Sequence, residues 1–298
     1  MEPQVRAAFE TTRPLDLHST LAPIGPGPSL FFDGADAWRA TRTPEGPATI
    51  HLRQRAGTIE VEAWGPGGEW AVAHAPHLCG EQDDPTGFAP QHRVIAELHR
   101  RHPGLRLTRT GAVFEALVPS VLAQKVTTIE AHAGYRALVR ALGEAAPGPV
   151  RLMLPPASHV LARTPYWAFH PFGIERRRAE VIIRAARSAN RLEEITTMDR
   201  PSAYRRLEAF PGVGPWTAAK VALVALGDPD AVPVGDFHLP HAVGYALEGT
   251  PRSSDERMLQ LLDPYRGHRA RVIRLLTMSG IGAPRFGPHK PLRDITDN

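Results

Sequence analysis

The stretch LEAFPGVGPWTAAKVALVAL, residues 207–226, stops one helical pattern and starts another almost at once. Two prolines and two glycines lie between residues 211 and 215, and the helical pattern resumes at Trp216. Glycine suits a tight turn, and proline suits the first position of a helix. The sequence therefore predicts two helices that are joined by a short hairpin.

Such a hairpin exposes backbone N–H groups from its turn and from the first turn of the second helix. Oriented N–H groups at the start of a helix bind anions such as phosphate. We expect a phosphate-binding hairpin of Gly212, Val213 and Gly214, continued by Trp216 and Thr217, with Val213 packed into the core. An ordinary helix–turn–helix corner is the alternative.

A second motif is VPVGDFHLP, residues 232–240, in which Asp236 follows a loop rich in Pro and Gly and precedes a helical pattern. An aspartate at that position can serve as the N-cap of the helix. Twenty-two residues separate Gly214 from Asp236, which is enough for one helix out and one loop back. The spacing therefore predicts that the Asp236 carboxylate returns toward the hairpin.

A zinc site is a competing interpretation of the same segment, because Asp236, His238 and His241 could supply oxygen and nitrogen ligands. No further ligand is evident nearby in the sequence, and Pro240 restricts the segment, so a catalytic metal is disfavoured. Cys79 is the only cysteine, which excludes a disulfide framework, a four-cysteine iron–sulfur cluster and a cysteine-rich zinc site.

The composition of the 298-residue chain, with 42% hydrophobic and 22% charged residues, is typical of a soluble globular protein. A net charge of +4 does not by itself identify a nucleic-acid-binding protein. Nearly all basic residues are arginines, which suit bidentate phosphate binding but also follow from a genome rich in G and C. No apolar run is long enough for a membrane span or a signal peptide, so we expect an intracellular, cytoplasmic protein without membrane contact.

The chain changes character near residue 90. Five short runs before that point have strand-like alternation or composition, namely SLFFDG, AWRATRT, ATIHLRQR, TIEVEAWG and EWAVAHAP. The composition of residues 77–90 predicts a polar, turn-rich linker. Helical periodicity dominates afterwards, at 91–101, 113–124, 128–142, 157–163, 175–189, 201–209, 215–226, 237–247, 254–262 and 267–279. We expect an α+β fold with an N-terminal antiparallel β-sheet domain at 1–90 and a helical region at 91–298 that ends in an irregular arm.

In combination these motifs resemble the helix-hairpin-helix DNA glycosylases. The family's hairpin is matched by LEAFPGVGPWTAAKVALVAL, and its catalytic aspartate falls at Asp236. Its first core helices resemble LRLTRTGAVFEALVPSVLAQKVTTIEAHAGY, where Gln124 occupies the usual glutamine position, and PFGIERRRAEVIIRAAR and DPYRGHRARVIRLLTMSG also fit. The resemblance covers most of the chain and implies an antiparallel N-terminal domain followed by an all-α helix-hairpin-helix glycosylase core.

Within that family the chain is most similar to the 3-methyladenine (alkylbase) glycosylases, of the DNA-3-methyladenine glycosylase II type. The resemblance implies an enzyme of base excision repair that flips a damaged, alkylated purine out of double-stranded DNA and hydrolyses its N-glycosidic bond. Asp236 would stabilise the oxocarbenium-like transition state, activate water, or do both. Members that also cut the strand carry a Schiff-base lysine where this chain has Trp216, so a monofunctional enzyme is expected.

The resemblance further implies no required cofactor, no iron–sulfur cluster and a monomeric protein. A monovalent cation, Na⁺ or K⁺, would bridge the backbone carbonyls of Phe210, Gly212 and Val213 to a DNA phosphate.

The base pocket is expected to use Trp216, Phe237 and Gln124. Tyr166 and Trp167, in TPYWAFHPFG, are further candidates for lesion recognition, although simple core packing is the alternative for this run.

Two lysines depart from the family pattern. Lys125 stands where the alkylbase enzyme has an apolar wedge, and we expect it to contact DNA, as we do His238. Lys220 and Thr277 stand where the best-known alkylbase enzyme has aromatic residues. Lys220 is expected at the surface or facing phosphate, with a displaced lyase nucleophile as the alternative. The other functions that the sequence leaves open are a glycosylase for oxidised or deaminated bases and a catalytically inactive DNA-binding protein.

Overall fold

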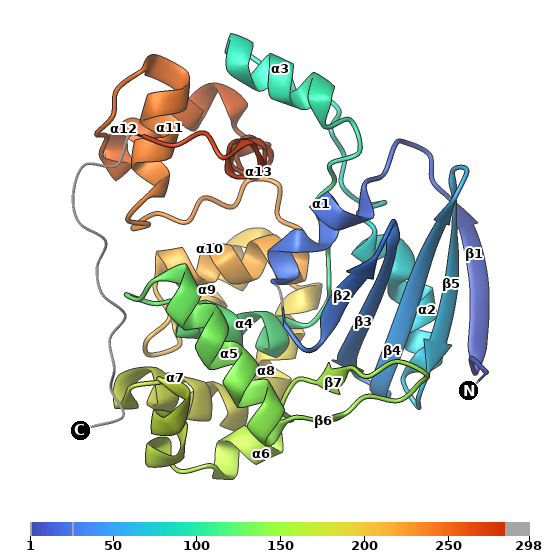
Figure 1. The fold of residues 1–298 in the computed structure, drawn as a ribbon. Helices are drawn as coiled ribbons and strands as arrows, with labels where there is room; N and C mark the ends of the chain where they lie inside the picture. Colours follow the sequence, from blue (N-terminus) through green and yellow to red (C-terminus); the bar gives the residue numbers. More distant parts are fainter. Residues whose placement is uncertain (1, 26, 284–298) are drawn as a thin grey trace.

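A computed structural model of the chain describes residues 2–25 and 27–283. Its N-terminal part is one antiparallel sheet with the strand order β1-β5-β4-β3-β2 (Figure 1). The strands are β1 (Val5–Glu10), β2 (Leu30–Asp33), β3 (Asp36–Thr43), β4 (Gly46–Arg55) and β5 (Thr58–Trp64). The four strands β2 to β5 form the meander that the sequence predicts, and β1 adds an outer strand that the sequence analysis did not anticipate.

The run EWAVAHAP was expected to be a strand, but it forms part of helix α2 (Gly68–Leu78). Its buried residues Ala71, Ala75 and Leu78 follow the spacing of one helical face, and they pack against the apolar face of the sheet. In a run this short, alternating apolar residues do not distinguish a strand from a helix. This prediction was therefore wrong in element type.

The linker expected at residues 77–90 is also corrected, because part of it is buried. Cys79 has no exposed surface, and the side chain of Asp83 is 1% exposed. Arg271, which is 2% exposed, donates from Nη2 to both Asp83 carboxylate oxygens at 2.7 and 2.6 Å. This segment therefore ties the N-terminal part to the last helix, and the domain boundary at residue 90 stays a prediction.

Helices dominate the rest of the described chain, as predicted. They are α1 (Leu17–Leu21) within the sheet region and then α3 (Arg93–Arg101), α4 (Val113–Leu122), α5 (Thr128–Leu142), α6 (Ser158–Arg163), α7 (Arg176–Arg187), α8 (Ala189–Glu193), α9 (Arg200–Glu208), α10 (Pro215–Val221), α11 (Leu239–Glu248), α12 (Asp255–Leu262) and α13 (Arg269–Ser279). Shorter turns are η1 (Ala22–Ile24), η2 (Tyr166–Phe172), η3 (Glu194–Thr197), the π-helical η4 (Ala222–Leu226) and η5 (Asp263–Tyr265), and β6 (Glu144–Ala145) pairs with β7 (Met153–Leu154).

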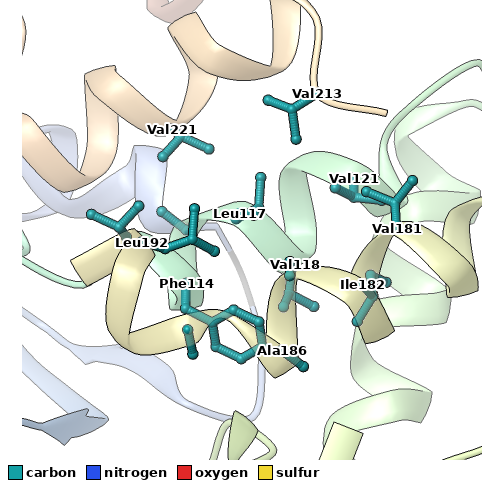
Figure 2. Close-up of a cluster of buried hydrophobic side chains, with 14 of the residues drawn as sticks. Phe114, Leu117, Val118, Val121, Val181, Ile182, Ala186, Leu192, Val213 and Val221 are labelled. Carbon is teal, nitrogen blue, oxygen red and sulfur yellow. The ribbon is translucent and has the colours of Figure 1, made fainter. Parts of the chain in front are cut away.

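One apolar core anchors the predicted hairpin. Figure 2 shows Val213 and Val221 above side chains of α4 and α7. Val213 is 4% exposed, which confirms that the hairpin inserts this residue into the core. The core residues labelled with them are Phe114, Leu117, Val118, Val121, Val181, Ile182, Ala186 and Leu192. Because the hairpin's apolar residue is buried, its glycines are held at the surface.

A second helical cluster forms from α11, α12 and α13 with α3, around buried residues such as Ile95, Val243 and Met258 (Figure 1). The segment from residue 227 to residue 238 connects α10 to this cluster, so Asp236 lies between the two groups of helices. No helix within the described ranges combines the length and apolar character that a membrane crossing requires. The arm expected at the C-terminus, from residue 284 on, lies outside the described residues.

Candidate functional site

The hairpin has the predicted form. Helix α9 ends at Glu208, the Val213 N–H donates to the Phe210 carbonyl at 2.9 Å, and α10 begins at Pro215. The Ala218 N–H donates to the Gly214 carbonyl at 2.9 Å and so begins the helical ladder. Pro215 has no N–H, and the N–H groups just before Ala218 precede that ladder, so they can serve an external acceptor. Gly212 and Gly214 are both exposed beside them.

Gly212→Ala is expected to destabilise the protein by about 2 to 4 kcal/mol, because it adds backbone strain and an overpacked contact. Gly212 has φ +95°, and an added Cβ would lie 2.3 Å from Val181 Cγ2 in the core. Gly214→Ala is the matched control, because its backbone is extended and a Cβ there would meet nothing within 4 Å. Urea unfolding of both variants checks this prediction, and equal losses of stability would contradict it.

Gln124 braces the hairpin from the end of α4. Its Nε2 donates to the Gly212 carbonyl and to Thr217 Oγ1, both at 2.9 Å. Thr217 is 2% exposed, so its hydroxyl takes part in the brace beneath the hairpin, and its expected phosphate contact stays a prediction. The structure thus gives Gln124 a positioning role, and its expected place in the base pocket stays a prediction.

Lys125 follows Gln124 directly and is exposed. Its φ is +57°, a left-handed conformation that few residues other than glycine adopt. The brace between Gln124 and the hairpin fixes the backbone on one side of Lys125, which places this lysine at the hairpin edge. That position is compatible with the expected DNA contact.

Asp236 meets the hairpin helix through a side-chain hydrogen bond. Trp216 Nε1 donates to Asp236 Oδ2 at 2.9 Å, while the backbone N–H groups of His238 and Leu239 donate to Asp236 Oδ1, each at 2.9 Å. The expected N-cap role is corrected, because α11 begins at Leu239 and its N-cap residue is His238, two residues after Asp236. The Asp236 carboxylate instead accepts the N–H groups of that N-cap residue and of the first helical residue, and it also returns to α10, as the spacing predicts.

The electrostatics keep Asp236 ionised. Burial on its own would raise the pKa of Asp236, but the indole N–H of Trp216, the two backbone N–H groups and the nearby charge of Lys220 together hold that pKa below its ordinary value. No lysine, arginine or histidine of residues 2–25 and 27–283 forms an ion pair with Asp236 within 4.0 Å. The result is a fixed anion whose charge is balanced by dipoles and not by a contacting cation.

Lys220 is less exposed than the expected surface lysine, and whether it faces a phosphate stays a prediction. It lies on α10 one turn after Trp216, so the two side chains share a helix face. The residue is only partly exposed, and the protein around it disfavours the charged form of its side chain. Burial lowers the pKa of Lys220, Asp236 raises it, and the Arg274 charge lowers it again, with a net decrease. The sequence does not indicate this partial burial, because the helical pattern at 215–226 is equally compatible with a fully solvent-exposed Lys220.

Two further residues beside Lys220 were not singled out from the sequence. Arg274 of α13 is buried, and its Nη2 donates to the Ser19 carbonyl of α1 at 2.9 Å. Burial lowers the pKa of Arg274 to about 10 and also lowers the pKa of His132 on α5, which feels the charge of Lys220. Thr277, by contrast, lies on the exposed side of α13 and bonds to the Ile273 carbonyl at 2.7 Å.

Two aromatic residues, Trp216 and Phe237, lie at Asp236. Phe237 is 77% exposed and lies next to the carboxylate in the chain, and Trp216 contacts the carboxylate directly. Tyr166 and Trp167 line a different groove of about 440 Å³, which α6, η2 and α7 form. Neither Asp236 nor Trp216 lines that groove. The structure therefore does not bring Tyr166 and Trp167 to Asp236, and the hypothesis that they recognise the lesion loses its geometric basis.

The metal alternative can be tested on the donor atoms themselves. His241 Nδ1 accepts from the Ser253 N–H at 3.0 Å, and both Asp236 oxygens already accept N–H groups. In the part of the chain that the structure describes, no group of three His, Cys, Asp or Glu residues could hold a metal ion. Asp236 and His241 thus use their donor atoms in other bonds, and these residues are not gathered as a ligand set.

The hairpin carbonyls, in contrast, retain capacity for a monovalent cation. The Phe210 oxygen accepts from Val213 N, and the Gly212 oxygen accepts from Gln124 Nε2, each at 2.9 Å. A carbonyl oxygen has two lone pairs, so one acceptance leaves the second available. These residues therefore fit the cation that the resemblance implies.

Comparisons with known proteins show what the chain as a whole is similar to. No family model matches the chain. A Mycobacterium tuberculosis protein named "Probable bifunctional transcriptional activator/DNA repair enzyme AlkA" is 34% identical over 178 residues, which are 57% of this chain and 35% of that protein. The chain spans between 35% and 58% of the length of the DNA repair relatives that it matches.

The structural likenesses extend over nearly the whole chain. The 3-methyladenine DNA glycosylase of Archaeoglobus fulgidus has a TM-score of 0.77 at 20% identity, with 92% of this chain and 98% of that chain covered. The 8-oxoguanine glycosylase/lyase of Clostridium acetobutylicum, in complex with double-stranded DNA, has a TM-score of 0.72 at 12% identity, with 94% and 98% covered. At these identities the likenesses show the fold, and they confirm the α+β architecture that the sequence predicts.

Proposed function

We propose that this chain is a monofunctional DNA glycosylase of base excision repair, of the helix-hairpin-helix superfamily that its motifs resemble, and its similarity to named DNA repair proteins supports this proposal. It flips a damaged purine out of duplex DNA and hydrolyses the N-glycosidic bond, with an alkylated purine as the first candidate substrate. The observation that carries this proposal is the ionised Asp236 carboxylate, which the hairpin helix holds through Trp216 at 2.9 Å.

Asp236 supplies the charge that the reaction needs. When the bond between C1′ and the base breaks, the sugar acquires the positive charge of an oxocarbenium ion, and a preorganised anion beside it lowers the barrier. Three N–H groups fix the Asp236 carboxylate, so it does not have to reorganise during the reaction. The same carboxylate can orient the attacking water or accept its proton. This role separates an enzyme from a bare DNA-binding scaffold, in which Asp236 would serve only to hold the start of α11.

DNA is held at its backbone and the flipped base on aromatic faces. The exposed N–H groups around Gly212, Gly214 and the start of α10 bind a phosphate, and Lys125 and His238 contact the DNA beside it. The carbonyls of Phe210, Gly212 and Val213 would hold a monovalent cation that bridges to the same phosphate. The rings of Trp216 and Phe237 stack on the base, at about 1 to 3 kcal/mol per stacked base. We also propose that the protein is a monomer and that it is cytoplasmic. The mechanism depends on neither property.

The test is release of free base from duplex oligonucleotides that each carry one lesion. The set contains 7-methylguanine, 3-methyladenine, hypoxanthine, ethenoadenine and 8-oxoguanine, and chromatography identifies the released base. We expect release from an alkylated or deaminated purine, with strand breaks only after hot alkali because the product is an abasic site. Strand cleavage without alkali would contradict the monofunctional assignment, and binding without any release would favour the inactive DNA-binding alternative.

Trp216→Phe is expected to move the acid limb of the pH–rate profile toward higher pH. The ionised Asp236 is the active form, so the rate falls as the pH falls through the pKa of this carboxyl, which the fold holds low. Loss of the indole N–H donor raises that pKa by about 1 to 2 units, since a hydrogen bond to a charged group is worth about 1.5 to 3 kcal/mol. Single-turnover rates between mildly acidic and neutral pH measure the shift. Trp167→Phe is the control, because that indole lies in the other groove, and an equal shift there would contradict the assignment.

A further inference from the structure

Lys220 places a positive charge near Asp236, and its ammonium group has no hydrogen-bond or ion-pair partner among the described residues. It follows Trp216 by one helical turn, on the face from which Trp216 reaches the carboxylate. Across the described residues, the Lys220 ammonium makes neither a hydrogen bond nor an ion pair within 4.0 Å. Asp236 nevertheless acts on it electrostatically, so the two charges lie near each other with a gap between them.

The surroundings of Lys220 do not neutralise it. Asp236 approaches from the segment before α11, Arg274 from α13 and His132 from α5. Of these three groups only Asp236 is negative, and its oxygens already accept N–H donors. An ammonium that the protein partly shields from solvent, and to which none of these groups offers a free acceptor, favours a ligand that supplies one and repels a second cation.

We propose that Lys220 selects the charge of the damaged base: the site prefers purine lesions that are uncharged in DNA over lesions with a fixed positive charge, such as 7-methylguanine. The inference rests on the proposed function and names the substrate class of the same site. It depends on the position of Lys220 one turn beyond Trp216, beside the carboxylate that marks where the reacting sugar lies.

The chemistry of the leaving base supports this preference. An uncharged purine departs as an anion unless it gains a proton, whereas a methylated cationic purine departs neutral. As the bond between C1′ and the base nitrogen breaks, its electron pair goes to the base, and the Lys220 ammonium gives a proton to a base nitrogen or oxygen. Water then bonds to C1′ and loses its proton to Asp236 or solvent, and Lys220 regains a proton from solvent. Burial lowers the pKa of Lys220 and makes its ammonium a better proton donor near neutral pH.

Lys220→Met is the decisive variant, because it removes the charge and keeps the length of the side chain. Single-turnover excision is measured on matched duplexes that carry hypoxanthine, which is uncharged, or 7-methylguanine, which is cationic. We expect the hypoxanthine rate to fall by about 10- to 100-fold, within the range for loss of a general acid. The 7-methylguanine rate is expected to stay constant or rise by up to about tenfold, which corresponds to about 1.4 kcal/mol of barrier.

Two control variants separate charge from proton transfer and from DNA contact. Lys220→Arg keeps the charge but does not release a proton, since the guanidinium group of arginine stays protonated at any pH at which the protein is folded. It should stay poor on 7-methylguanine and also become slow on hypoxanthine. Lys125→Met removes an exposed lysine at the hairpin edge, and it should change both rates by the same factor. Thermal unfolding and binding to undamaged duplex confirm that each variant is folded.

The outcomes distinguish the inference from the proposed function. An equal fall on both lesions in Lys220→Met would overturn the inference and assign Lys220 to DNA binding or folding, and unchanged rates would overturn it as well. A covalent adduct with abasic DNA that borohydride traps in the native chain, and that Lys220→Met abolishes, would replace it with a lyase nucleophile. If the native chain releases no base from any lesion, the proposed function fails, and the inference fails with it.

Discussion

Asp236→Asn is expected to lower the rate of base release by about 10² to 10⁴, the range for loss of a positioned acid or base group. The substitution removes the negative charge that faces the oxocarbenium-like sugar and leaves the volume of the side chain almost unchanged. Asparagine can still accept the backbone N–H groups of His238 and Leu239, but its amide then turns a donor toward the indole N–H of Trp216. Activity should therefore fall while the start of α11 stays formed.

The measurement is single-turnover release of a damaged base from duplex DNA, together with affinity for the same duplex and thermal unfolding. Asp199→Asn is the matched control, because Asp199 caps α9 by accepting the Ser202 N–H at 2.9 Å but is exposed and away from the hairpin. Asparagine is about as good an N-cap as aspartate, so this control should leave both activity and stability near native. If Asp236→Asn retains the native rate, as the control does, Asp236 serves only to hold the start of α11 and the proposed mechanism is wrong.

The hairpin and the Asp236 segment could be predicted because their signals are local. Prolines and glycines within a few residues mark where one helix ends and the next begins, and Val213 is the one apolar residue between the two glycines. Its burial then follows from the need to cover an apolar side chain. The return of Asp236 to the hairpin followed from the spacing alone, and the bond from Trp216 Nε1 shows it in the structure.

The rest depended on contacts between distant parts of the chain. Lys220 looked like a surface lysine because a helix pattern does not reveal what packs on its polar face, and α13 and Asp236 supply that surface. From the sequence, Tyr166 and Trp167 looked available to contact a flipped base. The packing of α6 and η2 against α7 places them in a separate groove instead. The segment around Asp83 looked like a linker because its buried partner lies 188 residues away.

Asp83→Asn is expected to destabilise the protein by about 3 to 5 kcal/mol, the cost of leaving a buried charge without its partner. The Arg271 guanidinium donates to both oxygens of Asp83, and the two side chains are 2% and 1% exposed. Asp83 Oδ2 also accepts the Leu107 N–H at 3.0 Å, so the same carboxylate fixes the segment that leads to α4. Removing its charge therefore loosens the N-terminal part, this segment and α13 together.

Urea unfolding measures this loss, with Asp263→Asn as the control variant. Asp263 pairs with Arg266 at the surface, where the two side chains are 59% and 73% exposed, so its loss should cost no more than about 1 kcal/mol. If the Asp83–Arg271 pair joins the sheet and the helices into one cooperative unit, the native chain unfolds in a single transition. Asp83→Asn should then shift its midpoint or split it into two. Equal small effects of both variants would contradict this view, because the N-terminal part and α13 would then be held together by apolar contacts alone.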